Sequence, residues 1–361
     1  MLQSDIRNIC IVSPSLKMGG IERALVVLAN YFATKGYSVT FISCLSGEHF
    51  YTLEKDIKLI EPGFHRTEGL FNKLVFYPRV IRFIRRKVKM VRPDTVLVFG
   101  DWFSPLVLLA LLGTRFPVYI SDRTSPDYKF SFPIPLMKKL LYPRSAGFIA
   151  QTNKAAEFKR KQFGSNLNIN VIPNALREVK TYPVPREKII LYVGRFAWEK
   201  APERLIKAFS GIQYRQGWTL LMAGSGPMSK QLKELVEELD ISEEVHFLGK
   251  VADVDLLYAR ASIFVLPSRL EGFPNSLCEA MAAGLPVVCF KSIPWKDIIE
   301  TGINGLVVGI NNNRTLSEAI EILILNHKLR TQYGENAKSI IDKLNVEDIG
   351  SQIINFISTK S

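Results

Sequence analysis

The stretch SRLEGFPNSLCEAMAAGLPVV, residues 268–288, holds two glutamates, Glu271 and Glu279, with a Gly-Phe-Pro-Asn turn between them. The turn residues predict that the backbone bends sharply after Glu271 and that a helix follows, capped by Asn275 or Ser276. This helix carries so little charge that we expect it to be mostly buried. Two carboxylates and several backbone N–H groups therefore converge at one helix N-terminus, near its positive end.

Short apolar runs alternate with amphipathic helical patterns on both sides of this stretch. The first half contains NICIVS, SVTFISC, TVLVFG, PVYIS and GFIAQT, and the second half IILYVG, WTLLMAG, EVHFLG, SIFVLPS, PVVCF and NGLVVG. Such runs are typical of parallel strands buried on both faces, and we expect helices between them, including residues 21–36, 77–91 and 152–163. The pattern predicts an α/β protein with two Rossmann-like, doubly wound parallel-sheet domains.

The boundary between the two domains is expected in REVKTYPVPREK, residues 177–188, where two prolines and mixed charge indicate a linker. We therefore predict an N-terminal domain over residues 1–176 and a C-terminal domain over 189–345. The amphipathic pattern that begins at residue 346 predicts a last helix, within 346–361, that packs back on the first domain.

The chain of 361 residues has 47 Lys and Arg against 34 Asp and Glu, a net charge of +13. This excess suggests an anionic partner, namely a nucleotide, a nucleic acid or an anionic membrane surface. We expect no nucleic-acid partner, because the sequence lacks an interleaved aromatic and basic recognition motif. The four cysteines form no C-x-x-C pair and are interpreted as core thiols in a reducing compartment.

Membrane attachment is expected to be peripheral. WFSPLVLLALLG, residues 102–113, is about half of the roughly 20 residues that a span needs, and it predicts a buried helix. The first residues include Asp5 and Arg7 where a signal peptide needs an apolar run. Basic residues mix with apolar ones in 77–93 and 130–144, which suggests contact with anionic lipid; the alternative for 77–93 is a core helix with a solvated basic face. We expect a cytoplasmic protein on the inner face of the cell membrane.

Polar residues suited to a ligand follow the expected strands, where ligands of open α/β sheets bind. In the second half, Arg195 and Lys200 follow one strand, and a Gly-Ser-Gly turn follows the next. In the first half, Gly19 and Gly20 follow the first strand, and Asp101 follows another expected strand.

Taken together, these elements resemble the retaining GT-B glycosyltransferases of family 4, glycosyl transferases group 1, of the bacterial surface-polysaccharide type. The hallmark of that family is a pair of glutamates separated by seven residues, here in EGFPNSLCE. The other matches are Gly194-Arg195 followed by Lys200, Gly224-x-Gly226, and Gly19-Gly20 before a helix. The resemblance covers nearly the whole chain and implies two domains that face a central cleft. It implies that residues 1–176 bind the acceptor and that residues 189–345 bind the nucleotide sugar.

The resemblance also implies residue roles. Glu271 is expected to bind donor-sugar hydroxyls, Glu279 the ribose, and Arg195 and Lys200 the diphosphate, without a metal or other cofactor. Further donor contacts are expected at Gly19, Gly20, Gly194, Gly224, Gly226, Lys250, Val251, Phe273, Pro274, Asn275, Ser276 and Leu277. Asp122 lies where related enzymes carry a His, Glu or Asp that faces the acceptor, so it joins Glu271, Arg195 and Lys200 as a catalytic candidate. Asp101 and Arg123 are acceptor-binding candidates.

The residue types agree with that chemistry. Negative charge grows on a departing diphosphate, and two fixed cations with a helix N-terminus stabilise it more in the transition state than in the ground state. The single Asp-x-Asp match, Asp253-Val254-Asp255, is interpreted as the start of a solvated helix rather than as a metal site.

Simpler interpretations remain for several of these residues. Glu279 could serve only the helix dipole. Arg195 and Lys200 could be ordinary surface cations, Gly224-Ser-Gly226 could be only a turn, and Arg123 could be paired with an acid.

The function that we predict is transfer of a hexose or N-acetylhexosamine, with retention, from a nucleotide donor, UDP-linked, to a hydroxyl of a glycan acceptor. The acceptor is expected to be a lipid-linked saccharide or another surface-polysaccharide precursor. The alternatives are a UDP-sugar 2-epimerase of the same fold and a non-catalytic sugar-nucleotide-binding module.

Overall fold

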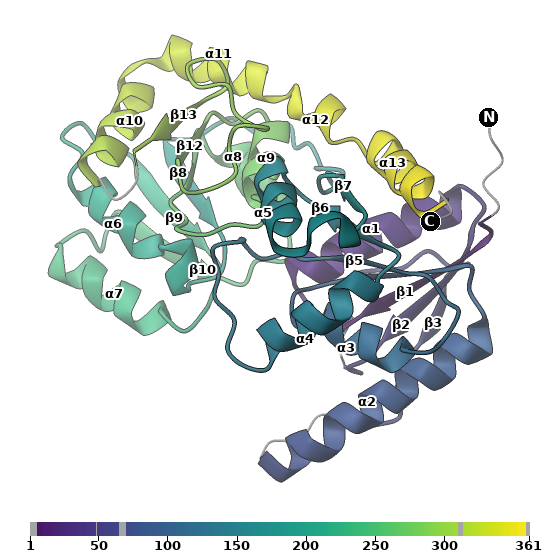
Figure 1. Ribbon diagram of the computed structural model, residues 1–361. Helices are drawn as coiled ribbons and strands as arrows, with labels where there is room; N and C mark the ends of the chain where they lie inside the picture. The colour runs from purple at the N-terminus through teal and green to yellow at the C-terminus, as the bar shows by residue number, and fades with distance from the viewer. Residues whose placement is uncertain (1–5, 48, 65–69, 310–312, 359–361) are drawn as a thin grey trace. The chain divides into compact units, whose positions relative to one another are not determined.

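The computed structural model describes residues 6–47, 49–64, 70–309 and 313–358. The chain forms two compact units, which we name unit 1 (Met1–Ala175 with Leu344–Ser361) and unit 2 (Leu176–Lys343). Each unit contains a parallel β-sheet with helices packed against it (Figure 1). The α/β architecture predicted from the alternating runs is confirmed.

The sheet of unit 1 has the strand order β3-β2-β1-β4-β5-β6-β7 within the described residues. Its strands are β1 (Asn8–Ser13), β2 (Ser38–Ser43), β3 (Lys58–Ile60), β4 (Thr95–Phe99), β5 (Val118–Ser121), β6 (Gly147–Ala150) and β7 (Ile169–Val171). The five predicted runs are all strands. The two strands that the sequence missed, β3 and β7, are short edge strands with only partial burial, so their apolar signal is weak.

The helices of unit 1 are α1 (Gly20–Thr34), α2 (Leu70–Val91), α3 (Phe103–Leu111), α4 (Ile134–Leu141), α5 (Asn153–Phe163) and α13 (Val346–Ser358). Short 3₁₀ turns lie at η1 (Tyr142–Arg144) and η2 (Gly164–Asn166). Helix α2 begins at Leu70, before the predicted start at residue 77, and it contains Pro78. Helix α13 lies against α1, where the Tyr31 hydroxyl donates a hydrogen bond to the Glu347 carbonyl (3.2 Å).

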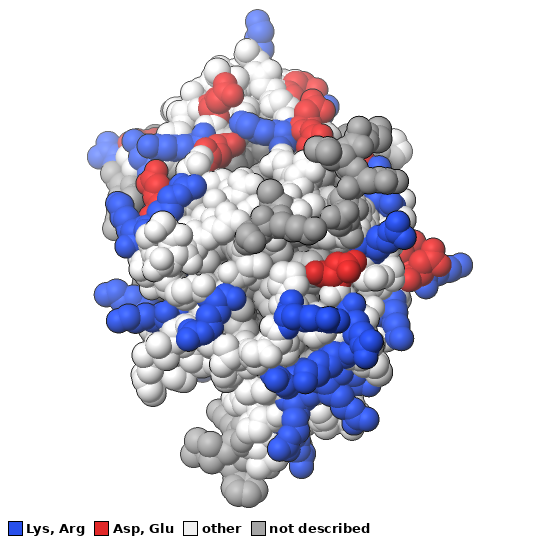
Figure 2. Space-filling model, turned by 45° about the vertical axis from the view of Figure 1, so that its right-hand side comes forward, with Lys and Arg blue, Asp and Glu red and all other residues white. Residues whose placement is uncertain are grey.

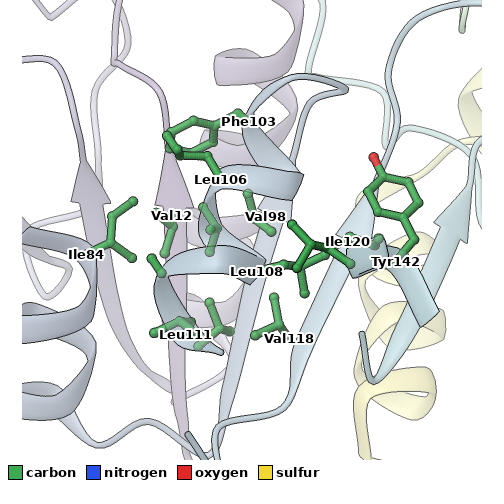
Figure 3. Close-up of a cluster of buried hydrophobic side chains, with 14 of the residues drawn as sticks. Val12, Ile84, Val98, Phe103, Leu106, Leu108, Leu111, Val118, Ile120 and Tyr142 are labelled. Atoms are coloured by element: carbon green, nitrogen blue, oxygen red, sulfur yellow. The ribbon is translucent and has the colours of Figure 1, made fainter. Parts of the chain in front are cut away.

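Helices α2 and α3 cover one face of this sheet. Val80, Ile84 and Val88 repeat every four residues along α2, and all three are buried. Figure 3 shows Ile84 with side chains of α3 beside labelled residues of β1, β4 and β5. Residues 102–113 thus contain a buried core helix, as predicted, and none of the helices in the described ranges is long and apolar enough to cross a membrane.

The sheet of unit 2 has the order β10-β9-β8-β11-β12-β13 in the described part of the chain. Its strands are β8 (Ile189–Val193), β9 (Thr219–Ala223), β10 (Val245–Gly249), β11 (Ile263–Leu266), β12 (Val287–Phe290) and β13 (Gly305–Val308), as the six runs predicted. Its helices are α6 (Pro202–Ser210), α7 (Ser229–Glu238), α8 (Val254–Arg260), α9 (Asn275–Ala282), α10 (Asn313–Leu325), α11 (His327–Ala337) and α12 (Ile340–Lys343), with a 3₁₀ turn η3 (Trp198–Lys200). Residues 172–187, which lead into β8, have no regular secondary structure.

Strand order determines where a ligand can bind in each unit. Chain direction across the sheet reverses between β1 and β4 in unit 1 and between β8 and β11 in unit 2. Because the strands are parallel, the loops that follow each of these pairs emerge at the same edge, on either side of a switch point. In unit 2 these are the loops that carry Lys200 and Glu271. The four cysteines are buried in the two cores, as predicted.

Candidate functional site

A partly buried ion pair joins the two loops at the switch point of unit 2. The Lys200 ammonium lies 2.7 Å from each carboxylate oxygen of Glu271. The Ser268 hydroxyl donates a further hydrogen bond to Glu271 Oε1 (2.8 Å), and only 8% of Glu271 is exposed. The carboxylate is therefore held in one orientation by two groups from different parts of the chain.

Backbone hydrogen bonds bring the two loops together. The N–H groups of Arg269 and Leu270 both donate to the Glu199 carbonyl (2.8 and 3.1 Å), and the Arg269 guanidinium donates to the Trp198 carbonyl (2.7 Å). These hydrogen bonds thus hold the turn η3 against the loop segment that precedes Glu271. These contacts could not be predicted from the sequence, because most of them are made by main-chain atoms.

The glycines after β9 are needed because two loops approach closely. Gly224 has a φ of +151°, and a Cβ added there would lie 1.9 Å from the Gly194 carbonyl oxygen. A Cβ at Gly226 would lie 2.3 Å from the Phe196 carbonyl oxygen. The Phe196 N–H also donates to the Ser225 carbonyl (3.0 Å). Close packing explains the Gly-x-Gly turn, and its contact with a donor stays a prediction.

Arg195 is not brought to the Lys200–Glu271 pair. Its guanidinium forms an ion pair with Glu199, four residues later, and 65% of the side chain is exposed. The Arg195 main chain is fixed, since its carbonyl accepts from the buried Tyr192 hydroxyl (3.0 Å). A role at the diphosphate would require the side chain to leave Glu199, and it stays a prediction.

Helix α9 begins at Asn275, and the N-cap position is Pro274, which has no side-chain cap. The expectation that Asn275 or Ser276 caps the helix is wrong, because both residues already lie inside its first turn. The chain enters the helix through a tight turn, in which the Asn275 N–H donates to the Phe273 carbonyl (3.0 Å). Phe273, Pro274 and Leu277 are buried, whereas Asn275 and Ser276 are partly exposed.

Glu279 lies in the second turn of α9 and is 3% exposed. Its Oε2 atom accepts hydrogen bonds from the Arg177 guanidinium (3.2 Å) and the Tyr258 hydroxyl (3.3 Å). A glutamate placed only for the helix dipole would need neither contact. Instead, this carboxylate is buried and oriented by a cation and a phenol, and its contact with a ribose stays a prediction.

The Asp-x-Asp match has a structural role. Asp253 caps α8 and accepts from the Asp255 N–H (3.2 Å). The interpretation of this segment as solvated is wrong for Asp255, which is 5% exposed and pairs with Arg177. No group of three or more His, Cys, Asp or Glu side chains suited to a metal occurs among the residues that the structure describes.

The remaining donor candidates divide between the two units. Lys250 is exposed and Val251 partly buried after β10, and this loop is tied to the preceding one by a hydrogen bond from the Gly224 N–H to the Gly249 carbonyl (2.8 Å). In unit 1, Gly19 is the N-cap of α1 and Gly20 its exposed first residue.

The absence of a side chain at Gly19 leaves room for a carboxylate. A Cβ there would lie 2.1 Å from Glu22 Oε2. Burial raises the pKa of Glu22, although the Ser15 hydroxyl donates to its carboxylate (3.1 Å). The Tyr51 hydroxyl donates to the Gly19 carbonyl (3.0 Å) and fixes this turn.

The acceptor candidates of unit 1 form a buried ionic cluster at the ends of β4 and β5. Asp122 pairs with Lys138 (2.9 Å) and Lys159 (2.6 Å), and it also accepts from the Tyr142 hydroxyl. Asp101 pairs with Lys138 (2.8 Å) and accepts from the Arg123 N–H (2.9 Å). Both lysines are 6% exposed. The sequence missed these lysines, because nothing along α4 or α5 marks a buried ammonium.

The charges of this cluster shift its pKa values in opposite directions. Burial acts to raise the pKa of Asp122, but the ammonium groups of Lys159 and Lys138 outweigh it and hold this pKa at about 2. Burial, with the charge of Asp122, raises the pKa of Asp101 despite its contact with Lys138. These contacts favour Asp122 as a group that holds the loop in place, and its catalytic role stays a prediction.

Arg123 is anchored beside the cluster. Its guanidinium stacks on the Phe99 ring, 3.4 Å from the ring centroid, and donates to the Asn174 side chain. Burial lowers the pKa of Arg123 to about 9. The Arg123 guanidinium contacts an amide and an aromatic ring. The Arg123 backbone N–H, and not the guanidinium, donates to the Asp101 carboxylate. Its contact with an acceptor stays a prediction.

The fold and the loops at the switch points define a glycosyltransferase of the GT-B class. Two family profiles match the chain, glycosyl transferases group 1 over residues 177–340 and glycosyltransferase family 4 over residues 18–189. The chain therefore belongs to the family 4 glycosyltransferases, as the motifs in the sequence predicted.

Similar proteins span almost the whole chain. The Campylobacter jejuni enzyme GalNAc-alpha-(1->4)-GalNAc-alpha-(1->3)-diNAcBac-PP-undecaprenol alpha-1,4-N-acetyl-D-galactosaminyltransferase is 25% identical over 359 residues, covering 97% of this chain and 98% of that enzyme. Sucrose-phosphate synthase from Thermosynechococcus elongatus has the same fold, with a TM-score of 0.83, 20% identity, and coverage of 96% and 97%. Anabaena HepE, solved in complex with UDP-glucose, has a TM-score of 0.79, 18% identity, and coverage of 98% and 100%.

Proposed function

We propose that the chain transfers a hexose or N-acetylhexosamine from a UDP-linked donor to a hydroxyl of a lipid-linked or surface-polysaccharide precursor, with retention of configuration. The observation that carries this proposal is the Lys200–Glu271 pair at the switch point of unit 2, together with the buried Glu279 on the adjoining helix. A carboxylate accepts two hydroxyl hydrogen bonds, so Glu271 suits the sugar and Glu279 the ribose.

The geometry of Lys200 allows it to contact Glu271, on the sugar side of the reacting bond, and a phosphate oxygen of the leaving group at the same time. An ammonium has three N–H donors, and two of the distances from Lys200 are to Glu271. The third donor can reach a phosphate oxygen while Glu271 keeps its position. Charge on the leaving diphosphate grows in the transition state, where a fixed cation stabilises it most. We infer that cations of the chain fill the place that a metal has in other transferases.

The likeness to known proteins supports the choice of donor and acceptor. HepE was solved in complex with UDP-glucose, and the Campylobacter enzyme is named for an undecaprenol-diphosphate-linked saccharide. Both proteins cover nearly all of this chain, so the same two kinds of substrate are the first to test here.

A lipid-linked acceptor would require unit 1 to meet a membrane, and two surfaces of this unit suit anionic lipid. Helix α2 turns basic side chains outward, and Figure 2 shows Lys and Arg gathered in the lower part of the molecule, where this helix lies; the exposed ones are Arg79, Arg82, Arg86 and Lys89. Around α4, Phe132, Leu136 and Leu140 repeat every four residues and are 81%, 46% and 54% exposed. Basic residues beside an exposed apolar stripe are the composition of an interfacial segment.

A panel of nucleotide sugars tests this proposal. The melting temperature of the purified protein is measured with each sugar nucleotide in turn. In a separate assay on folded protein, release of the nucleoside diphosphate is followed with and without a polyprenyl-diphosphate-linked saccharide. We expect a UDP-sugar to raise the melting temperature and the acceptor to raise UDP release. Release of UDP with conversion of the sugar to its 2-epimer would identify an epimerase. Binding without turnover in the presence of a range of acceptors would identify a binding module.

A further inference from the structure

Arg177 lies outside the sequence motifs, and its guanidinium contacts Glu279, the residue that we propose binds the ribose. It lies at the start of unit 2, in the irregular segment that leads into β8. Its guanidinium pairs with both carboxylate oxygens of Asp255 and with Glu279 Oε2 (3.2 Å). The side chain is 23% exposed, whereas those of Asp255 and Glu279 are 6% and 4% exposed.

The pairing with Asp255 fixes the guanidinium before any ligand arrives. A two-pronged contact with a carboxylate sets the plane of the guanidinium as well as its position. The Lys180 N–H donates to the same carboxylate (3.0 Å), and the Arg177 guanidinium also donates to the Glu178 carbonyl (2.9 Å). Burial acts to lower the pKa of Arg177, but the contacts with Asp255 and Glu279 outweigh it, so the group stays charged.

We propose that Arg177 is a positioning residue of the nucleotide site, which holds the Glu279 carboxylate in the orientation that receives the ribose hydroxyls. This inference rests on the proposed function, in which Glu279 binds ribose. Arg177 and the Tyr258 hydroxyl meet the same Glu279 oxygen, so together they set the direction of its carboxylate.

The experiment measures UDP affinity by calorimetry in a double-mutant cycle. We expect Arg177→Ala to weaken UDP binding about tenfold, which corresponds to about 1.4 kcal/mol, and Arg177→Lys to recover part of the loss. In a Glu279→Ala background, the same Arg177 substitutions are expected to change UDP affinity less than twofold. With the complete donor, KM is expected to rise with kcat nearly unchanged, because ribose contacts are equal in the ground and transition states.

Matched variants separate positioning from folding. Arg260→Ala breaks an exposed ion pair with Glu187, the last residue of the same segment, and is expected to leave UDP affinity unchanged. Tyr258→Phe removes a hydroxyl that contacts Glu279 and the Ser276 carbonyl (3.3 Å each), and should weaken UDP binding severalfold even if Arg177→Ala does not fold.

Two outcomes overturn the inference, and they are distinct from failure of the proposed function. Equal effects of the Arg177 substitutions with and without Glu279 would assign Arg177 a purely structural role. Unchanged UDP affinity in Tyr258→Phe and in a folded Arg177→Ala protein would remove the positioning role. If the wild-type protein binds UDP, GDP, ADP and dTDP equally poorly, the proposed function fails first and the inference fails with it.

Discussion

Replacing Lys200 by methionine removes the ammonium of the Lys200–Glu271 pair and keeps most of the aliphatic volume. Two effects are expected, because Lys200 has two partners in the proposed reaction. The leaving diphosphate loses a donor whose contribution grows in the transition state, typically worth about 2–4 kcal/mol. This lowers kcat by roughly 30- to 1000-fold, with a smaller change in KM.

The second effect is on stability. Glu271 is 8% exposed and would lose a cation that lies 2.7 Å from both oxygens. Breaking a fully buried pair costs about 3–5 kcal/mol, but 28% of the Lys200 side chain is exposed, so water replaces part of the interaction. We expect a loss of about 1–2 kcal/mol, seen as a melting temperature lower by roughly 3–6 °C.

Adding Glu271→Gln separates the two effects. The double variant has no buried unpaired charge, so its melting temperature should return toward that of the wild type while kcat stays low. Lys230→Met is the matched control, since Lys230 is 91% exposed and lies 3.7 Å from its partner Glu234. A folded Lys200→Met protein with kcat within threefold of the wild type would refute the reasoning and place the diphosphate elsewhere.

Three further predictions follow from the same structure. Glu279→Ala should weaken binding of UDP itself, whereas Glu271→Ala should weaken only the complete UDP-sugar; equal losses by calorimetry would contradict this division. Asp122→Asn should cost at least about 2 kcal/mol of stability at pH 7, because the native pKa of about 2 lies below the unfolded value. The wild-type contribution is present above about pH 4 and is lost toward pH 2, so the two proteins should converge in acid-unfolding curves. Protein should leave anionic vesicles at low salt when glutamate replaces Arg79, Arg82, Arg86 and Lys89, and failure of the wild type to sediment would exclude the membrane surface.

Arg85 is left out of this set for a structural reason. It lies among the basic residues of α2, and from the sequence it is equivalent to its neighbours. In the structure its guanidinium donates to the carbonyls of Ala110 and Leu112 (2.9 and 2.8 Å) and so ties α2 to the end of α3. Its replacement would therefore change folding as well as charge.

The sequence predicted most of the fold because both sheets are parallel and buried. Strands covered on both faces are apolar throughout, so central strands such as β4 and β11 are recognised from short runs alone. The start of α2 was predicted too late, at residue 77, whereas the helix begins at Leu70 and contains Pro78. Helix α4 was seen only as a basic and apolar stretch, since its exposed leucines obscure the usual pattern of one buried face.

The candidate site was predictable only as a set of residues, and not as a set of contacts. Spacing singled out Glu271, Glu279 and Lys200, but no spacing showed that Lys200 pairs with Glu271. Arg177 lies in the segment whose composition predicted a linker, and its partners Asp255 and Glu279 are 78 and 102 residues away in sequence. Ion pairs over such separations depend on the order of the strands in the sheet. That order follows from how the whole chain packs, and no local sequence pattern shows it.

The carboxylates of Asp122 in unit 1 and Glu271 in unit 2 have different partners, and this difference bears on how the acceptor hydroxyl loses its proton. In unit 1, Asp122 is surrounded by Lys138, Lys159 and Tyr142, and a carboxylate with a pKa of about 2 is too weak a base to take a proton from a sugar hydroxyl at neutral pH. In unit 2, Glu271 is held by Lys200 and Ser268 in a geometry suited to accept hydroxyl hydrogen bonds. In the proposed reaction, an oxygen on the departing diphosphate gains negative charge as the glycosidic bond breaks, and it can take the proton that Asp122 is too weak a base to accept. This reasoning favours a same-face substitution, in which the leaving group helps to deprotonate the acceptor, and a retained α-linkage in the product would be its stereochemical signature.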